Sequence, residues 1–155
     1  MDLFLTRLAL NSHADVSDGQ PVLVFINGEI WGHCNIRERV NKHYFASQEG
    51  IIDEDIIDNI DILNNDGIAS NGDARDYRVL SHYMATHDLN DPEALAYVLT
   101  QLDVDSLFDY AAYEMICGNK DLSNTRFYRI PGGKWTWTLY DLDTAMAGTG
   151  SAPIG

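Results

Sequence analysis

Apolar and polar residues alternate in two regions of the chain, and each region has a turn signal between two alternating runs. In the first region, residues 21–26 are rich in β-forming side chains, and a second apolar run covers residues 29–37. Asn27-Gly28 separates the two runs, and both residues tolerate the positive φ angles of a tight two-residue turn. The pattern predicts a β-hairpin.

The second alternating region lies near the end of the chain. Residues 126–130 and 134–140 flank Pro131-Gly132-Gly133, a sequence typical of turns. The apolar residues that share one face of the later run are Trp135, Trp137 and Leu139. We predict a second hairpin here, and Asp141 follows it directly.

Between the hairpins the pattern changes to that of amphipathic helices. The clearest helix follows Asp103, which can accept hydrogen bonds from the free amides of a first turn, and it stops at Gly118. Its expected buried residues are Val104, Leu107, Phe108, Ala111, Met115 and Ile116. Asp91-Pro92 predicts another helix start, because Asp caps helices and Pro is tolerated at the first helical position. Its expected buried residues are Leu95, Val98, Leu99 and Leu102.

Weaker signals cover the middle of the chain. A helical pattern runs through Tyr44-Phe45, and Asp73 is placed to cap a further helix. Residues 51–63 have aliphatic side chains at helical spacing, but their many Asp residues weaken the helix prediction. Residues 64–72 have the composition of a loop. Hairpins combined with helices indicate the α+β class.

The chain is strongly acidic. It contains 24 Asp and Glu against 10 Lys and Arg, which gives a formal charge of -14. A nucleic-acid surface needs clustered Lys and Arg, so this composition argues against a nucleic-acid partner. The 155 residues, with 45% hydrophobic and 22% charged side chains, have the balance of one globular domain.

Neither cysteine indicates a metal site. Cys34 and Cys117 lack a CxxC or His spacing, so we interpret both as buried free thiols, with one disulfide as the alternative. No apolar run has the length needed to cross a bilayer, and residues 1–5 lack the features of a signal peptide. The chain opens directly in a helical pattern and ends in a loop-like sequence, which predicts an incomplete domain.

The second hairpin carries the candidate chemistry. A polar loop with Asp121 and Asn124 precedes it, and Asp141 and Asp143 follow it. Because a hairpin brings its two ends together, we expect Asp121 and Asp141 to face each other. Carboxylate and amide oxygens form a ligand set suited to Mg²⁺ or Mn²⁺. Taken singly, each residue has a simpler interpretation, as a turn former or as a cap at a strand end.

Several segments together resemble the spore coat protein H (CotH) kinase family. The segments that carry the resemblance are PVLVFINGEIWG at 21–32, NIRER at 35–39, LDVDS at 102–106, GNKD at 118–121, FYR at 127–129, GKWTW at 133–137 and YDLD at 140–143. The first and the last of them are the most specific.

This resemblance implies an atypical protein-kinase-like fold and the transfer of phosphate from ATP to Ser or Thr of a protein partner, with Mg²⁺ or Mn²⁺. It matches Asp121 with the catalytic-loop acid, and Asp141 with a metal ligand that Asn124 assists. Trp135 matches an aromatic residue that stacks on adenine. Arg37 is the candidate for binding phosphate, with an ion pair to a neighbouring acid as its simpler interpretation. A spore-coat, secreted or cell-surface location is implied as well.

We therefore predict a single partial domain over residues 1–155. Its N-terminal part, to about residue 90, contains the first hairpin, and the part from about residue 91 contains the helix, the catalytic loop and the metal-binding hairpin. Two other classes remain open. A pseudokinase-like module would bind partners without turnover, and an unrelated secreted domain would bind Ca²⁺ through its acids, although no loop has the EF-hand spacing.

Overall fold

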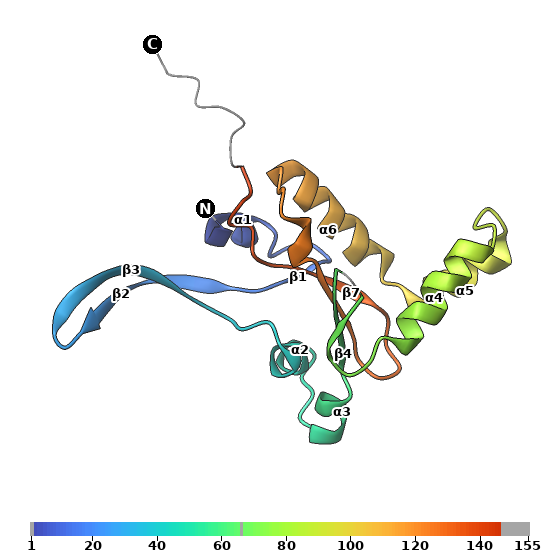
Figure 1. Cartoon of the computed structure of the whole chain (residues 1–155), viewed down its shortest axis with the longest axis horizontal. Coiled ribbons are helices and arrows are strands. Elements are labelled where there is room, and N and C mark those ends of the chain that lie inside the picture. Colours follow the sequence, from blue (N-terminus) through green and yellow to red (C-terminus); the bar gives the residue numbers. More distant parts are fainter. Residues whose placement is uncertain (1, 66, 147–155) are drawn as a thin grey trace, which may run out of the picture.

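Short helices and strands alternate along the chain in the computed structural model, which describes residues 2–65 and 67–146 (Figure 1). The helices are α1 (Asp2–Leu8), α2 (Lys42–Gln48), α3 (Glu54–Asp58), α4 (Arg75–Thr86), α5 (Pro92–Gln101), α6 (Val104–Cys117) and the 3₁₀ turn η1 (Leu122–Asn124). The strands are β1 (Asp15–Val16), β2 (Gly19–Ile26), β3 (Glu29–Arg37), β4 (Asp61–Asn64), β5 (Ala69–Asn71), β6 (Arg126–Arg129) and β7 (Thr136–Leu139).

A five-stranded sheet runs through the centre of the molecule. Its strand order is β1-β7-β6-β4-β5, with β1 parallel to β7 and the other neighbours antiparallel. The predicted α+β class is confirmed, but the second hairpin is part of this larger mixed sheet and does not stand alone. Strands from both sides of the division predicted near residue 90 enter the sheet, and the division itself stays a prediction.

Different helices cover the two faces of the sheet. Leu63 and Phe127 point into the larger core cluster, to which α1, α4, α5 and α6 contribute. Ile62 and Tyr128 point to the opposite face, where Phe45 of α2 stacks on Tyr128 with ring centroids 3.8 Å apart. Adjacent residues belong to opposite clusters, as the two-residue period of a strand requires.

The first predicted hairpin is confirmed as β2 and β3, which pair as a separate two-stranded sheet. Asn27 and Gly28 have φ angles of 54° and 84°, the pair of positive values that the turn needs. Figure 1 shows the hairpin extending away from the body of the molecule. Its side chains are accordingly open to solvent, and Trp31 is 71% exposed.

Both cysteines are free thiols, but only one of them is buried. Cys117 lies in the core as predicted, whereas Cys34 is exposed because β3 belongs to the projecting hairpin. Within the described residues, no helix is both long enough and apolar enough to cross a membrane.

Residues 51–63 differ from the helical prediction. Asp53 caps the short helix α3 by accepting from the amide of Asp55 at 3.0 Å, and the helix ends at Asp58 with Asn59 as its C-cap. The chain then extends into β4. The spacing of aliphatic residues in this stretch fits a helical turn and a strand equally well. Residues 61–64 form a strand because they pair with β6. β5 likewise lies inside the segment predicted as a loop.

The predicted ends of the later helices agree with the structure. Asp91 caps α5, and Asp103 and Gly118 bound α6, where Gly118 has a left-handed φ of 57°. At α4 the N-cap position is Ala74, but the predicted Asp73 provides the capping side chain, because its Oδ1 accepts from the amide of Arg75 at 2.7 Å. The prediction for the buried face of α5 is only half right, because Val98 and Leu102 are buried and Leu95 and Leu99 are exposed.

The buried face of α6 also differs from the prediction. Of the residues predicted to be buried, Val104 and Leu107 are partly buried against the core, whereas Phe108, Met115 and Ile116 are exposed. The residues that face inward are Ser106, Tyr110, Glu114 and Cys117. Ser106 accounts for this orientation, since its Oγ accepts from the amide of Trp137 at 2.7 Å and donates to the carbonyl of Trp137 at 3.2 Å. The helix thus satisfies backbone groups of β7 that an apolar face would leave unpaired.

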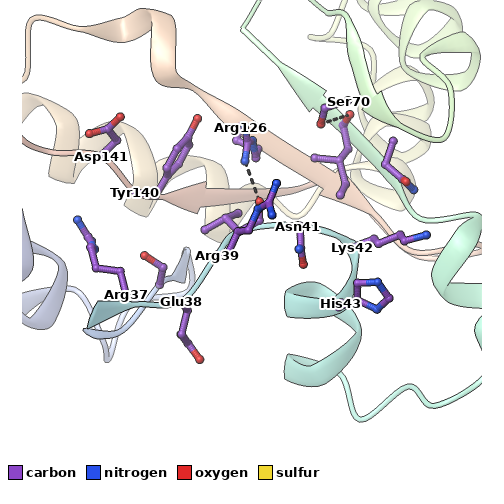
Figure 2. A pocket seen from close by; sticks show the side chains of 14 residues that line it. Arg37, Glu38, Arg39, Asn41, Lys42, His43, Ser70, Arg126, Tyr140 and Asp141 are labelled. Carbon is purple, nitrogen blue, oxygen red and sulfur yellow. Dashed lines mark hydrogen bonds between the residues drawn. The ribbon is translucent and has the colours of Figure 1, made fainter. Parts of the chain in front are cut away.

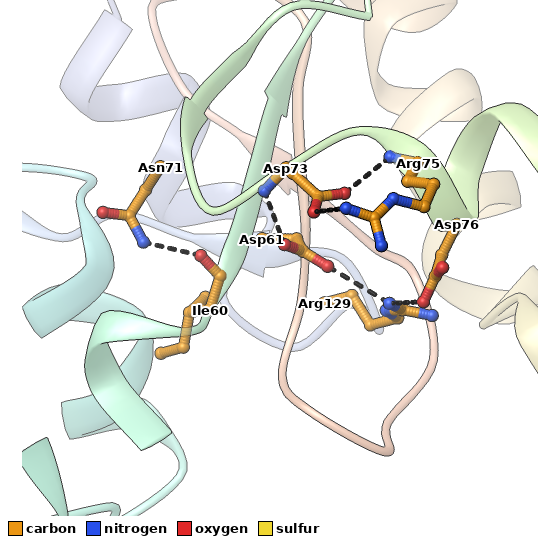
Figure 3. Close-up of polar contacts among 7 residues, drawn as sticks. All are labelled: Ile60, Asp61, Asn71, Asp73, Arg75, Asp76 and Arg129. Carbon is orange, nitrogen blue, oxygen red and sulfur yellow. Dashed lines mark hydrogen bonds and ion pairs between the residues drawn. The ribbon is translucent and has the colours of Figure 1, made fainter. Parts of the chain in front are cut away.

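Arg129 connects β6 to β4 and α4 (Figure 3). Its Nη2 donates to Asp61 Oδ2 at 3.1 Å and also to Asp76. Its guanidinium carbon lies 5.0 Å from the centroid of the Trp135 ring. Asp61 in turn accepts from the amide of Asp73 through its other oxygen at 2.8 Å. The paired charges are only 15% exposed at Arg129 and Asp61, so this connection holds the sheet to the start of α4.

Gly72 should be intolerant of any side chain, because it lies against this connection. Its φ is +63°, and an added Cβ would lie 2.3 Å from Asp61 Oδ1 and 2.9 Å from the carbonyl oxygen of Ile60. Gly132 has a similar φ of +79° with nothing within 4 Å, which makes it the matched control. We expect Gly132→Ala to cost about 1 kcal/mol of unfolding free energy and Gly72→Ala about 2 to 4 kcal/mol. Urea denaturation measures both values. If the two variants lost the same unfolding free energy, the clash with Asp61 would be relieved without cost.

Candidate functional site

The loop between α6 and β6 positions the first acid of the candidate site. Asp121 precedes the 3₁₀ turn η1, and its Oδ1 accepts from the amide of Ser123 at 3.2 Å and from the hydroxyl of the same residue. Its other oxygen, Oδ2, faces Asn124. The loop therefore holds the Asp121 carboxylate in one orientation, with each oxygen facing a different neighbour.

Asn124 joins the two ends of the β6–β7 hairpin. Its Nδ2 donates to Asp121 Oδ2 at 3.1 Å and to Asp141 Oδ2 at 2.9 Å. The structure thus brings together the three residues for which the sequence predicts proximity. Their role in metal binding stays a prediction.

Asp141 follows β7 in an unusual backbone conformation. Its φ is 58°, in the left-handed region that few residues other than glycine adopt. The next residue, Leu142, is buried, whereas Asp143 is exposed. Such conformations persist only where the surrounding structure fixes them, and they are frequent at functional sites. The left-handed backbone conformation of Asp141 accompanies the contact of its carboxylate with Asn124.

A pocket of about 850 Å³ opens beside Asp141. One wall runs from Arg37 at the end of β3 to His43 in the first turn of α2, and the other is the sheet surface with Arg126 and Tyr140 (Figure 2). Four of the 10 Lys and Arg residues in the chain line this single pocket. Glu38 and Asp141 also line the pocket, and Lys42 is paired with Asp58, so four basic and two acidic side chains leave the lining positive in a chain with a charge of -14. Such a surface suits an anionic ligand.

Arg37 lies in this pocket, on the wall opposite Asp141 (Figure 2). The charge of Arg37 lowers the pKa of Asp141. This placement is compatible with the predicted phosphate-binding role, because the guanidinium lies in the same pocket as the acid predicted to hold the metal.

The other three basic residues of the pocket were not predicted from the sequence. Arg39 follows Arg37 on the same segment, Lys42 begins α2, and Arg126 begins β6. Arg126 is fixed by donating to the carbonyl of Val40 at 2.8 Å and by lying 4.9 Å from the centroid of the Tyr140 ring. The motif NIRER contains Arg39, but no local pattern connects Lys42 or Arg126 to it.

Trp135 lies in the core and not in the pocket. Its side chain is 0% exposed. The rings of Tyr77 and Phe127 contact it edge to face, with centroids 5.2 and 5.7 Å from that of Trp135, and the Arg129 guanidinium lies over its ring. Stacking on adenine requires an open ring face, which this conformation does not provide. The adenine-stacking role of Trp135 thus stays a prediction that would require this packing to open. Tyr140 is the aromatic residue that the pocket does present.

The donor set at Asp121, Asn124 and Asp141 is small. Within the described part of the chain, no group of three or more His, Cys, Asp and Glu side chains is arranged to hold a metal. The Asp141 carboxylate with the Asn124 amide nevertheless fits Mg²⁺, which usually takes one or two carboxylates and completes its coordination with water and substrate phosphates. The Asn124 amide already bridges the two acids with a positively polarised group, which is the position that a cation would favour.

A family model described as CotH kinase protein matches residues 2–152 of the chain. No curated protein and no solved structure matches it.

The surroundings of Asp141 should shift its pKa in opposite directions when they are changed one at a time. Burial and then the charge of Asp143 raise the pKa of Asp141, and the charge of Arg37 opposes them. We expect Asp143→Asn to lower the pKa of Asp141 and Arg37→Gln to raise it, in an NMR titration of its carboxyl carbon. Asp88→Asn, a distant exposed site, is the control.

The sign for stability follows from the same shift. A folded-state pKa above the unfolded value means that the native state binds the proton more tightly, so this residue favours folding increasingly as pH falls through its raised pKa. Asp143→Asn should weaken this contribution. If Asp143→Asn and Arg37→Gln both shifted the pKa of Asp141 in the same direction, the described arrangement of charges would be wrong.

Proposed function

Because the chain belongs to the CotH kinase protein family, we propose that it is an atypical protein kinase. It transfers the terminal phosphate of ATP to a Ser or Thr hydroxyl of a protein partner and depends on Mg²⁺ or Mn²⁺. The observation that carries the proposal is the convergence of Asp121, Asn124 and Asp141 beside a basic pocket. A location on a spore coat or cell surface is the corresponding proposal for its place of action.

Electrostatics supports the assignment of the pocket to a nucleotide. ATP carries several negative charges, and most of this protein's surface would repel it, given the charge of -14. The wall with Arg37, Arg39, Lys42 and Arg126 provides local compensation. A guanidinium can bind two phosphate oxygens at once, so Arg37 and Arg39 suit this task better than lysines would.

Each residue of the site has a distinct proposed role. Asp141 would hold the metal, and Asn124 would assist after its amide turns to present its oxygen in place of the nitrogen that now faces the carboxylates. A bound divalent cation would neutralise phosphate charge and polarise the terminal phosphate. Asp121 orients the acceptor hydroxyl and takes its proton, since a carboxylate within hydrogen-bond reach can act as the base.

A binding module without turnover is the second candidate. The observation that favours it is the closed set of hydrogen bonds in which Asn124 satisfies both acids without a metal. Such a module would bind nucleotide or a protein partner through the same pocket.

Nucleotide binding should depend on divalent metal. Without metal the acids Asp121 and Asp141 would repel the phosphates of ATP. With ATP and Mg²⁺ at about 100 times Kd, the unfolding free energy should rise by roughly 2.7 kcal/mol. Thermal-shift titrations with and without EDTA measure this difference. Equal stabilisation by ATP in EDTA would exclude the metal role.

The two acids should respond differently to substitution. Asp141→Asn should abolish metal-dependent ATP binding, while Asp121→Asn should preserve binding and lose transfer, because only the acceptor step uses Asp121. Binding is measured by calorimetry, and transfer by labelled ATP with a library of Ser and Thr peptides. Asp105→Asn, an exposed acid on α6, is the control. Metal-dependent binding with no transfer in the unsubstituted protein would favour the binding module.

A further inference from the structure

A buried carboxylate lies directly behind the loop that carries Asp121. Glu114, on the inward face of α6, is 7% exposed, and no other Asp or Glu in the described part of the chain is as deeply buried. Its Oε2 has no hydrogen-bond partner, and burial raises the pKa of its carboxyl. Removing a carboxylate from water costs several kcal/mol unless partners compensate. For stability alone, an apolar residue would serve better at this position.

Two polar side chains, Asn119 and Tyr110, affect the pKa of Glu114, and each also contacts one end of the loop that carries Asp121. Hydrogen bonding from Asn119 and from Tyr110 opposes the raised pKa of Glu114. The Oη of Tyr110 lies 2.8 Å from Oγ1 of Thr125, where the loop ends. The Oδ1 of Asn119 accepts from the amide of Asp121 at 3.2 Å, near the start of the loop. Tyr110 and Asn119, the two side chains that lower the pKa of the buried Glu114 carboxyl, therefore contact the two ends of the loop.

Asn119 also contacts the segment that follows Asp141. Its Oδ1 accepts from Oγ1 of Thr144 at 2.6 Å. Two residues earlier, at the end of α6, the carbonyl of Cys117 accepts from the amide of Met146 at 2.7 Å. The end of α6 thus fixes the loop before β6 and the segment after β7 relative to each other.

We propose that Glu114 and Asn119 are positioning residues that set the placement of Asp121 relative to Asp141. This inference rests on the proposed function, in which Asp121 must reach the acceptor hydroxyl while Asp141 holds the metal. A displacement of about 1 Å in such a site can reduce the rate by roughly 100-fold. This role would explain why a carboxyl group is buried at position 114, since it orients the side chains of Asn119 and Tyr110.

The first test compares two substitutions of Glu114 in the full chain. Gln keeps an acceptor oxygen of the same shape for Asn119 and Tyr110, and Ala removes it. With the best peptide from the library, Glu114→Ala should lower kcat by about 10- to 100-fold and change the KM for ATP by less than about threefold. Glu114→Gln should stay within about threefold of the unsubstituted enzyme. Asp105→Ala removes an exposed carboxylate from the same helix and should change neither parameter.

The second test needs no turnover. Hydrogen exchange at the Asp121 amide should be at least about tenfold faster in Glu114→Ala and in Asn119→Ala, and unchanged in Asp105→Ala, because the bond to Asn119 Oδ1 protects that amide. If exchange responds but the unsubstituted protein transfers no phosphate, the positioning network stands and the proposed function fails.

Two results would overturn the inference. One is a kcat in Glu114→Ala equal to that of the unsubstituted enzyme, together with unchanged exchange. The other is a Gln variant as impaired as the Ala variant, which would assign the effect to charge. If Glu114→Ala does not fold, Tyr110→Phe removes one hydroxyl and keeps the ring; it should lower kcat by about 3- to 10-fold. An unchanged kcat in Tyr110→Phe then rejects the proposal.

Discussion

The antiparallel pairing of β6 with β7 is the constraint on which the candidate site depends. Phe127 pairs with Trp137 across the two strands, and their rings stack with centroids 5.0 Å apart, so backbone pairing and side-chain packing fix the same register. Asp121 and Asp141 lie beyond the two open ends of this ladder. A slip by one residue would turn the buried rings toward the other face, so the core opposes any change that would separate the acids. β1 on one side and β4 on the other then extend the pair into the full sheet.

Much of the fold follows from local patterns, and the exceptions share a physical cause. The turn at Asn27-Gly28, the Asp103 cap and the Gly118 stop depend on the backbone preferences of one or two residues, which are the same in any context. The face that α6 buries is decided otherwise, because Ser106 reaches backbone groups of Trp137, 31 residues later in the chain. Hydrophobic periodicity contains no information on such a partner. The strand β4 is similar, since only its neighbour β6 distinguishes it from a helical turn.

The candidate site likewise has one part that local sequence patterns predict and another part that they do not. Asp121, Asn124 and Asp141 could be placed together because a single hairpin connects them. The pocket could not be predicted, because its basic wall combines the segment after β3 with Arg126, and these meet only when β6 joins the sheet. Trp135 shows the limit of alternation, which places Trp135 and Trp137 on one face and does not tell whether that face meets ligand or core. Glu114 gave no sequence signal, because an acid on a helix is ordinarily interpreted as exposed.

An acidic molecule with one basic pocket has an uncommon response to ionic strength. Electrostatic forces extend about 30 Å at 0.01 M salt but about 10 Å at 0.1 M. In dilute salt, an incoming polyanion therefore meets the field of the whole molecule, with its charge of -14, and is slowed. At moderate salt the distant acids are screened, while the arginines of the pocket remain within range of a ligand at its entrance. Added salt should thus first accelerate association and only later retard it, whereas a basic protein loses rate from the first addition.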